Sequence, residues 1–259
     1  MPTIISDNQK KPQKQFDGLL SCARYAFMPN KLQYCGGTKN QDLFEYSTNK
    51  KSEPTLGHLL EEFQTLYPYL KLIADSNNIK DIFDYRVVEA YWLGNELLDN
   101  VNMNKLYWHF IDGLKLKKKI KHKEFEKLVG KIPQGALPHH SFHVFNVYFR
   151  TGHIAVKHSL ETMNSCCISW GKITKIKDTE LEISAPLLIS KNESLLFSEP
   201  QKKTVSFKFL DRTFIENPKI GDWITFHWNW ACEIINEQQL NNLQKYTNIC
   251  LKLANNRGI

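Results

Sequence analysis

Apolar side chains recur every three or four residues through the first half of the chain, the spacing that places them on one face of a helix. The first such segment covers 16–28 and stops before Pro29. A second begins at Thr55, and we expect Pro68 to kink or split it. Further helices are predicted over 84–99, 102–114, the lysine-rich 115–131, and 154–165.

After residue 166 the apolar positions alternate, which is typical of strands with one buried face. The alternating segments are 168–176, 179–185, 203–210 and 222–228. An amphipathic helix is predicted over 235–254, with Asn236 and Gln239 spaced as a capping box. Residues 142–149 also alternate and favour a strand, although a helix stays open there. Short strands joined by turns, without β–α–β alternation, favour a small barrel.

These patterns predict an α+β fold, with a helical N-terminal domain followed by a small OB-like β-barrel and a C-terminal helix. We expect a disordered lead-in over 1–15, a mainly helical domain over 16–160 and the barrel with its helix over 161–259. The middle of the barrel region, 185–204, looks like an insertion. No internal repeat is visible.

Composition narrows the class of protein. The 259 residues are 42% hydrophobic with a formal net charge of +7, a mild basic excess that falls short of a nucleic-acid-binding profile. No apolar run is long enough for a membrane span, and the polar N-terminus has no signal-peptide core. Six cysteines without a secretion signal indicate reduced thiols in the cytoplasm.

Several enzyme classes are excluded by their missing motifs. The chain has no phosphate-binding Gly-x-x-x-x-Gly-Lys-Ser/Thr loop, no Gly-x-Gly-x-x-Gly dinucleotide fingerprint and no Gly-x-Ser-x-Gly elbow. We therefore expect neither nucleotide hydrolysis, nor a Rossmann cofactor, nor serine-hydrolase chemistry.

A thiol and an imidazole stand at opposite ends of the predicted barrel strands. Cys166 precedes the first strand and lies five residues before Gly171, whereas His227 ends a later strand that follows Gly221. A thiolate and a nearby imidazole would form a two-point site for a soft metal ion if the fold brings them together. Cys167 is expected to face the other way, into the core.

The spacing of Cys166, Gly171, Gly221-Asp222, His227 and Ala231 resembles the HypC/HupF family of [NiFe]-hydrogenase maturation chaperones, over 166–254. The resemblance implies that Cys166 and His227 help to hold iron. It also implies a cytoplasmic accessory protein that binds a metallocentre maturation factor or a hydrogenase large-subunit precursor. In that family the cysteine is the mature N-terminus, whereas Cys166 lies inside the chain. The resemblance therefore supports a shared fold and a shared class of protein partner more strongly than it supports the transfer of a metal ion.

We expect three residues of the barrel region at the surface for this protein partner: Trp170, Gly171 and Trp228. The chain as a whole also resembles an uncharacterised prokaryotic family associated with hydrogenase genes, on the stretches 22–30, 66–70, 86–92 and 138–150. That second resemblance implies no established activity.

A histidine cluster in the helical half supports a different class of function. His139, His140 and His143 lie within five residues, with His153 and His158 downstream. On a helix, positions 139 and 143 would share a face and could share a metal ion. The alternative is therefore a metal-dependent enzyme with the barrel as a lid, although buried hydrogen-bonded histidines would give the same pattern.

Two further interpretations stay open. Cys22 and Cys35 could join the histidines as ligands or form a redox pair, without a Cys-x-x-Cys motif. Nucleic-acid binding through the barrel and the lysine-rich helix is a third function, which we do not expect at this net charge.

Overall fold

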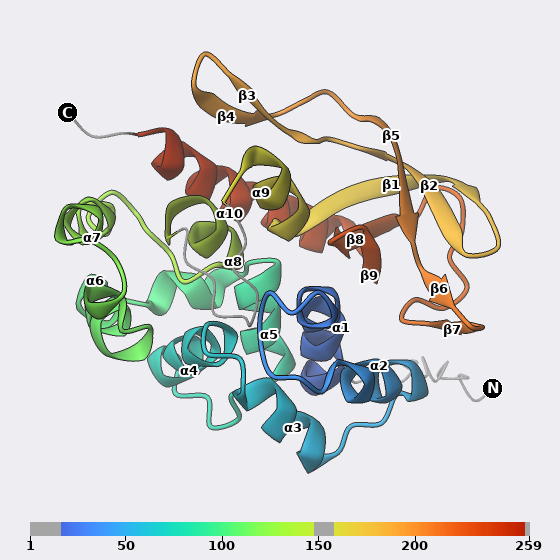
Figure 1. Cartoon of the computed structure of the whole chain (residues 1–259), viewed down its shortest axis with the longest axis horizontal. Helices are drawn as coiled ribbons and strands as arrows, with labels where there is room; N and C mark the ends of the chain where they lie inside the picture. The colour runs from blue at the N-terminus through green and yellow to red at the C-terminus, as the bar shows by residue number, and fades with distance from the viewer. Residues whose placement is uncertain (1–16, 148–157, 257–259) are drawn as a thin grey trace, which may run out of the picture.

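The computed structural model describes residues 17–147 and 158–256, so the predicted lead-in and His153 lie outside the described residues. Helices fill the first half and strands the second (Figure 1). The helical elements are α1 (Gly18–Lys31), α2 (Asn40–Asn49), α3 (Pro54–Glu61), α4 (Leu66–Ser76), α5 (Tyr85–Trp92), η1 (Glu96–Asn100), α6 (Met103–Trp108), η2 (His109–Gly113), η3 (Leu116–Lys118), α7 (His122–Val129), α8 (His140–Phe142), η4 (His143–Val147), α9 (Leu160–Cys166) and α10 (Glu237–Asn255).

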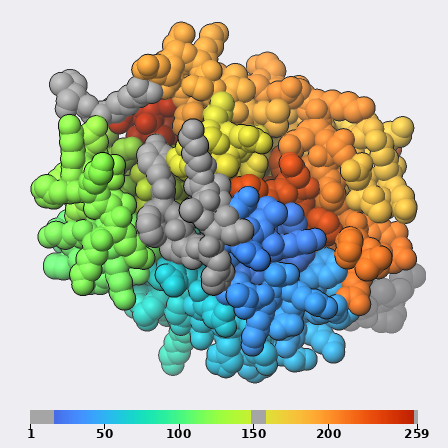
Figure 2. Space-filling model, viewed as in Figure 1, coloured from blue at the N-terminus to red at the C-terminus, as the bar shows by residue number. Residues whose placement is uncertain are grey.

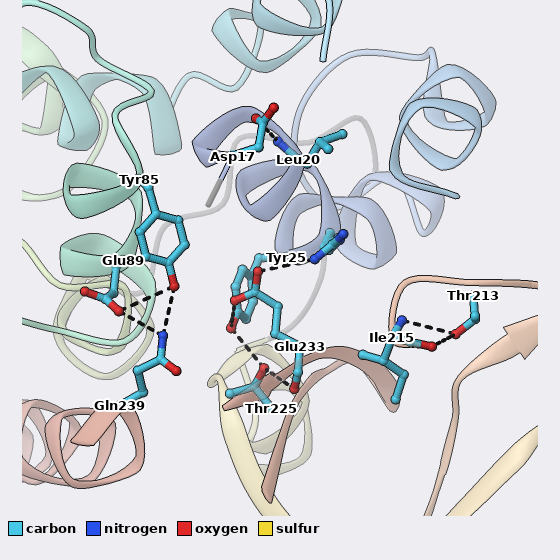
Figure 3. Close-up of polar contacts among 11 residues, drawn as sticks. Asp17, Leu20, Tyr25, Tyr85, Glu89, Thr213, Ile215, Thr225, Glu233 and Gln239 are labelled. Atoms are coloured by element: carbon cyan, nitrogen blue, oxygen red, sulfur yellow. Dashed lines mark hydrogen bonds and ion pairs between the residues drawn. The ribbon is translucent and has the colours of Figure 1, made fainter. Parts of the chain in front are cut away.

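Helix α1 lies at the junction of the two halves. Asp17 caps it by accepting a hydrogen bond from the Leu20 N–H at 3.1 Å (Figure 3). The helix contacts α2, α3 and α5 on one side and the strands β8 (Trp223–His227) and β9 (Trp230–Ile235) on the other. Because it is covered from both sides, nearly all of its apolar side chains are buried.

Proline and glycine set two of the helix boundaries. The helix expected from Thr55 is split into α3 and α4, as predicted, and Pro68 lies in the first turn of α4, where a missing N–H costs least. The helix expected over 84–99 ends at Trp92 instead. Gly94 follows with φ +89°, and a Cβ there would lie 2.1 Å from the Tyr246 ring of α10. The backbone turns at Gly94 so that the segment after α5 can lie directly against Tyr246 of α10.

The strand favoured over 142–149 is wrong in its described part. His140–Phe142 forms a helical turn and His143–Val147 a π-helical segment. Every residue from 140 to 147 is buried, since α8 packs against α10 and α5 while η4 packs against α10 and α9. A segment buried on all sides gives no reliable period from which to distinguish strand from helix.

The second half forms a strongly curved, five-stranded sheet in the ring order β1–β2–β5–β9–β8. Neighbouring strands pair antiparallel except β5 and β9, which are parallel and joined by the single pair Ser206–Trp230. This partly open barrel is the OB-type architecture, and the predicted α+β fold is confirmed. The remaining strands are β1 (Ser169–Ile176), β2 (Glu180–Ala185), β3 (Leu188–Lys191), β4 (Ser194–Phe197), β5 (Gln201–Ser206), β6 (Lys208–Phe209) and β7 (Arg212–Thr213).

The expected insertion contains a hairpin, β3–β4, that extends away from the barrel and contacts α9 and α10 (Figure 1). Asn255 at the end of α10 holds the hairpin through both main-chain groups of Leu195, at 2.8 and 2.7 Å. Helix α10 itself begins at Glu237 because Ile235 still pairs in β9. Its capping box between Asn236 and Gln239 is present as predicted.

One apolar core runs through both halves of the molecule. It contains side chains of α1, α5, α8 and α10 together with barrel residues such as Cys232, while a smaller core fills the barrel interior. In the space-filling view the first helices, in blue, lie directly against part of the second half, in orange (Figure 2). Among residues 17–147 and 158–256, no helix combines the length and the apolar character that a membrane crossing needs.

Candidate metal centre

Three potential metal ligands meet where α1, α8 and the barrel come together. Cys166 is the last residue of α9, His227 ends β8, and His140 begins α8. One ligand atom from each lies within 4.8 Å of the other two, and all three residues are buried. A thiolate and two imidazoles form a donor set that zinc, copper and iron accept in proteins. The group could therefore hold a metal ion.

A tight turn places His227 beside Cys166. Strands β8 and β9 are joined by Trp228 and Asn229, with φ values of 50° and 60°, so both adopt the left-handed conformation of a type I′ hairpin. Trp228 then donates its N–H to the carbonyl of Ser165 at 2.9 Å, one residue before the thiol. A tryptophan in this conformation is strained, and such strain concentrates at functional sites.

Main-chain carbonyls determine the tautomer of both histidines. His227 Nδ1 lies 2.7 Å from the Tyr25 carbonyl oxygen, and His140 Nε2 lies 2.9 Å from the Cys166 carbonyl oxygen. Because a carbonyl only accepts, both of these nitrogens carry a hydrogen. In the neutral rings the lone pairs then belong to His227 Nε2 and His140 Nδ1, which is the arrangement that metal-binding histidines adopt.

The surroundings keep His140 neutral and partly compete for its lone pair. Burial, with His227 nearby, lowers the pKa of His140 well below its usual value. Its Nδ1 lies 3.2 Å from the hydroxyl of Tyr91, which donates because this nitrogen has no hydrogen. Burial also raises the pKa of Tyr91 far above its usual value, so the phenol stays protonated.

Tyr25 supports the centre from α1. Its carbonyl holds His227, and its ring stacks on Trp92 with centroids 5.2 Å apart. At the other end its hydroxyl donates to Glu233 at 3.0 Å and contacts Thr225 at 2.9 Å (Figure 3). Trp92 in turn packs on the His140 ring at 4.6 Å. The side chain of Tyr25 is thus fixed at both ends, and its backbone presents one acceptor to the centre.

A small cavity of about 50 Å³ adjoins the three ligands. This exceeds the roughly 10–15 Å³ that one water needs, so an ion with a small additional ligand fits. The polar residues that line it, besides the three ligands and Tyr91, are Cys35, Thr65, His143 and His158. The rest of the lining is apolar or aromatic, so a bound ion would lie in surroundings of low polarity.

The predicted histidines divide between this cavity and its surroundings. His140 belongs to the cluster, and His143 lines the cavity with Nδ1 3.4 Å from the Tyr69 hydroxyl. His139 lies outside it: Nδ1 accepts the Ser141 N–H at 3.2 Å, and burial lowers its pKa to about 3. His139 therefore caps α8, a structural role.

The three residues expected at a partner surface have different environments. Trp170 is buried and packs against Phe197 at 5.2 Å. Gly171 is also buried, and a Cβ on it would lie 2.7 Å from Ile183. Trp228 is half-buried and its ring lies 4.8 Å from Tyr34. Of these, Trp228 is the residue with side-chain surface open to a partner.

Sequence reasoning treated the thiol and the histidine run as separate hypotheses, whereas the fold joins them. His140 and Cys166 are 26 residues apart, and Tyr25 and His227 are 202 apart. No motif spacing covers such distances. The sequence did not indicate that Tyr25 and Tyr91 contact the proposed ligands. Tyr25 contacts His227 through its backbone carbonyl, and Tyr91 contacts His140 through a hydroxyl buried in the helical core.

Fold and site together define an α+β protein in which an OB-type barrel and a helical half enclose a buried Cys-His₂ cluster. The chain belongs to a family of unknown function, DUF6390, whose family model matches residues 14–259. The expected membership of an uncharacterised family is confirmed. No curated protein and no solved structure matches the chain, so the resemblance to HypC/HupF chaperones stays a prediction.

Proposed function

We propose that this protein binds a transition-metal ion through His140, Cys166 and His227 and acts as an accessory protein in metallocentre assembly. The observation that carries the proposal is the convergence of three ligand atoms within 4.8 Å, from two helices and one strand. Two of the three, Cys166 and His227, are also the positions picked out by the resemblance to hydrogenase maturation chaperones. That resemblance favours a metallocentre of the [NiFe]-hydrogenase type and iron as the ion.

The local chemistry supports metal binding over a purely structural cluster. Both imidazoles are held by carbonyl acceptors in tautomers that leave each ring one nitrogen with a lone pair. A packing role alone would not require a thiol and two imidazoles to offer ligand atoms within 4.8 Å of one another. A soft thiolate with two imidazoles also favours iron, copper or zinc over magnesium or calcium.

The partner is proposed from the same resemblance. A maturation factor or a large-subunit precursor would approach the half-buried Trp228, because this residue joins His227 to the surface. Trp228 donates its N–H to Ser165 in the last turn of α9, so partner binding there would act directly on the helix end that carries the thiol.

Metal analysis of the purified, reduced chain tests the proposal. We expect about one equivalent of bound ion after loading with Fe²⁺ or Zn²⁺ and desalting, and a loss of at least about tenfold in affinity for Cys166→Ser, His140→Ala and His227→Ala. Cys250→Ala is the matched control, because Cys250 is equally buried but lies in α10. Equal metal content in the ligand variants and the control would refute the centre.

A metal-dependent enzyme is the second candidate, favoured by the cavity beside the ligands. Three protein ligands and an open position are typical of catalytic zinc sites, whereas structural sites have four. Azide added to the Co²⁺-loaded chain separates the two functions. A shift of the cobalt absorption bands would indicate an open position and favour the enzyme, and an unchanged spectrum would favour a closed, metal-holding site.

A further inference from the structure

With three ligands, the negative charge of the proposed centre does not balance the charge of a divalent ion. One thiolate and two neutral imidazoles carry a single negative charge, so a divalent ion would leave one net positive charge in the cavity. None of the described residues that line the cavity is an aspartate, glutamate, lysine or arginine. An unbalanced charge in such a lining is strongly disfavoured, because it loses its hydration without gaining a partner.

Two lining residues besides Cys166 could supply a second negative charge, namely Tyr91 and Cys35. Tyr91 is unsuited, since its hydroxyl donates to His140 Nδ1 at 3.2 Å and so occupies the nitrogen that would bind the ion. Cys35 is half-buried and bears a thiol, which loses its proton readily on metal binding. It is therefore the lining residue whose chemistry restores neutrality.

The position of Cys35 agrees with this role. Cys35 lines the same cavity as His140, Cys166 and His227, whereas Cys22 does not. Cys35 is not among the three residues whose ligand atoms lie within 4.8 Å of one another. Binding by Cys35 would therefore require its one side-chain torsion, which moves the sulfur, to change rotamer.

The loop that carries Cys35 is firmly built. The Tyr34 and Cys35 N–H groups both donate to the Pro29 carbonyl, at 2.8 and 3.3 Å. The buried Asn30 amide donates to the carbonyls of Cys35 and Gly37, at 2.9 and 2.6 Å. Gly36 follows with φ +79°, against the Phe63 ring. The backbone of Cys35 is thus held at the cavity by three hydrogen bonds to and from its own peptide groups and those of its neighbours.

We propose that Cys35 is the fourth ligand, so that the centre holds a divalent ion such as Zn²⁺ as a neutral Cys₂His₂ complex. This inference rests on the proposed function, because it completes the same centre. Binding releases one proton from each thiol to solvent and changes no oxidation state. Four protein ligands also close the site, which favours metal holding over catalysis at an open position.

Cobalt substitution of the full, reduced chain tests the fourth ligand. Thiolate-to-cobalt charge-transfer absorption scales with the number of bound thiolates. We expect Cys35→Ser to lose half of it, Cys166→Ser to lose half, and the double variant to lose all. Cys35→Ser should also weaken Zn²⁺ binding at least about tenfold in chelator competition. Cys22→Ala is the control, since Cys22 is a buried cysteine of α1 and does not line the cavity.

Alkylation of the wild-type chain gives a second measurement that needs no variant. Cys35 is half-buried and should react with iodoacetamide in the metal-free chain, and Zn²⁺ should slow that reaction at least about tenfold. Peptide mass mapping identifies the modified thiol.

The outcomes separate the two proposals. If Cys35→Ser keeps the wild-type cobalt spectrum and Zn²⁺ affinity, or if Zn²⁺ leaves Cys35 alkylation unchanged while Cys166→Ser loses binding, the fourth ligand is refuted and the three-ligand centre survives. If the wild-type chain binds neither Co²⁺ nor Zn²⁺, the divalent Cys₂His₂ centre is refuted. If it then also binds no iron or copper, the proposed function fails.

Discussion

At the scale of single residues, the His140 ring takes part in two interactions that oppose each other. Its Nε2–H is fixed by the Cys166 carbonyl, which leaves Nδ1 as the atom that can bind an ion. The same Nδ1 accepts the Tyr91 hydroxyl at 3.2 Å. A metal ion must therefore displace the phenol from this lone pair, and the lost hydrogen bond subtracts from the binding free energy.

Removal of that hydroxyl should tighten metal binding. A net hydrogen bond contributes about 0.5–1.5 kcal/mol, so Tyr91→Phe should lower the dissociation constant for Zn²⁺ by about two- to tenfold. Chelator competition measures the change. Tyr69→Phe serves as the control, because Tyr69 contacts His143 and not a ligand of the centre. Weaker binding by Tyr91→Phe would show instead that the hydroxyl supports the bound state.

At the scale of elements, the contact between the segment that follows α5 and helix α10 depends on one glycine. Gly94 combines a left-handed φ of +89° with a position where a Cβ would lie 2.1 Å from the Tyr246 ring. Tyr246 is buried in α10, so its ring cannot move aside without opening the core. This contact fixes the end of α5, which carries both Tyr91 and Trp92.

Gly94→Ala should therefore be much more harmful than an alanine at another left-handed glycine. We expect it to lower the free energy of unfolding by about 3 kcal/mol or more, because overpacking adds to backbone strain. Gly135→Ala is the matched control: φ is +98° and the space is open, so only about 1–2 kcal/mol of strain applies. Urea denaturation measures both. Equal losses would mean that strain alone, and not packing on Tyr246, sets the cost.

At the scale of the whole molecule, the spacing of apolar residues predicted most of the helices and strands. It did not predict that His140, Cys166 and His227 would lie together in the folded chain. The alternation after residue 166 predicted the barrel because its strands have one buried face. The same spacing favoured a strand at residues 142–149, and that prediction was wrong because residues 140–147 are buried on every side and have no exposed face to set a period. His140 joins Cys166 and His227 through tertiary packing alone, and no local pattern in a single sequence records such a contact.

The same burial makes the stability of the whole fold depend on pH. Burial lowers the pKa of His109 and of His139 to about 3, and that of His140 well below its usual value. These residues are neutral when folded but gain protons near pH 6.5 when unfolded, so stability is complete above that pH and falls as the pH drops toward the folded values.

The free energy of unfolding should decrease between pH 6.5 and pH 4 by about 1.4 kcal/mol per pH unit for each such histidine. Urea denaturation at a series of pH values measures the slope. His109→Gln should remove one histidine's share of the slope. A stability that stays constant down to pH 4 would contradict the assignment of neutral, buried rings.

Both imidazoles of the centre are aimed by peptide carbonyls, those of residues 25 and 166. A side-chain substitution does not remove a backbone carbonyl. The orientation of each imidazole therefore depends on the course of the backbone and not on which side chain the neighbouring residue has. Drift in the residues around the cavity would thus leave the ligand geometry intact as long as the fold is kept. A search for the proposed centre in other members of the family would therefore look for the thiol and the two histidines, because the residues that orient the two rings contribute only their backbone carbonyls.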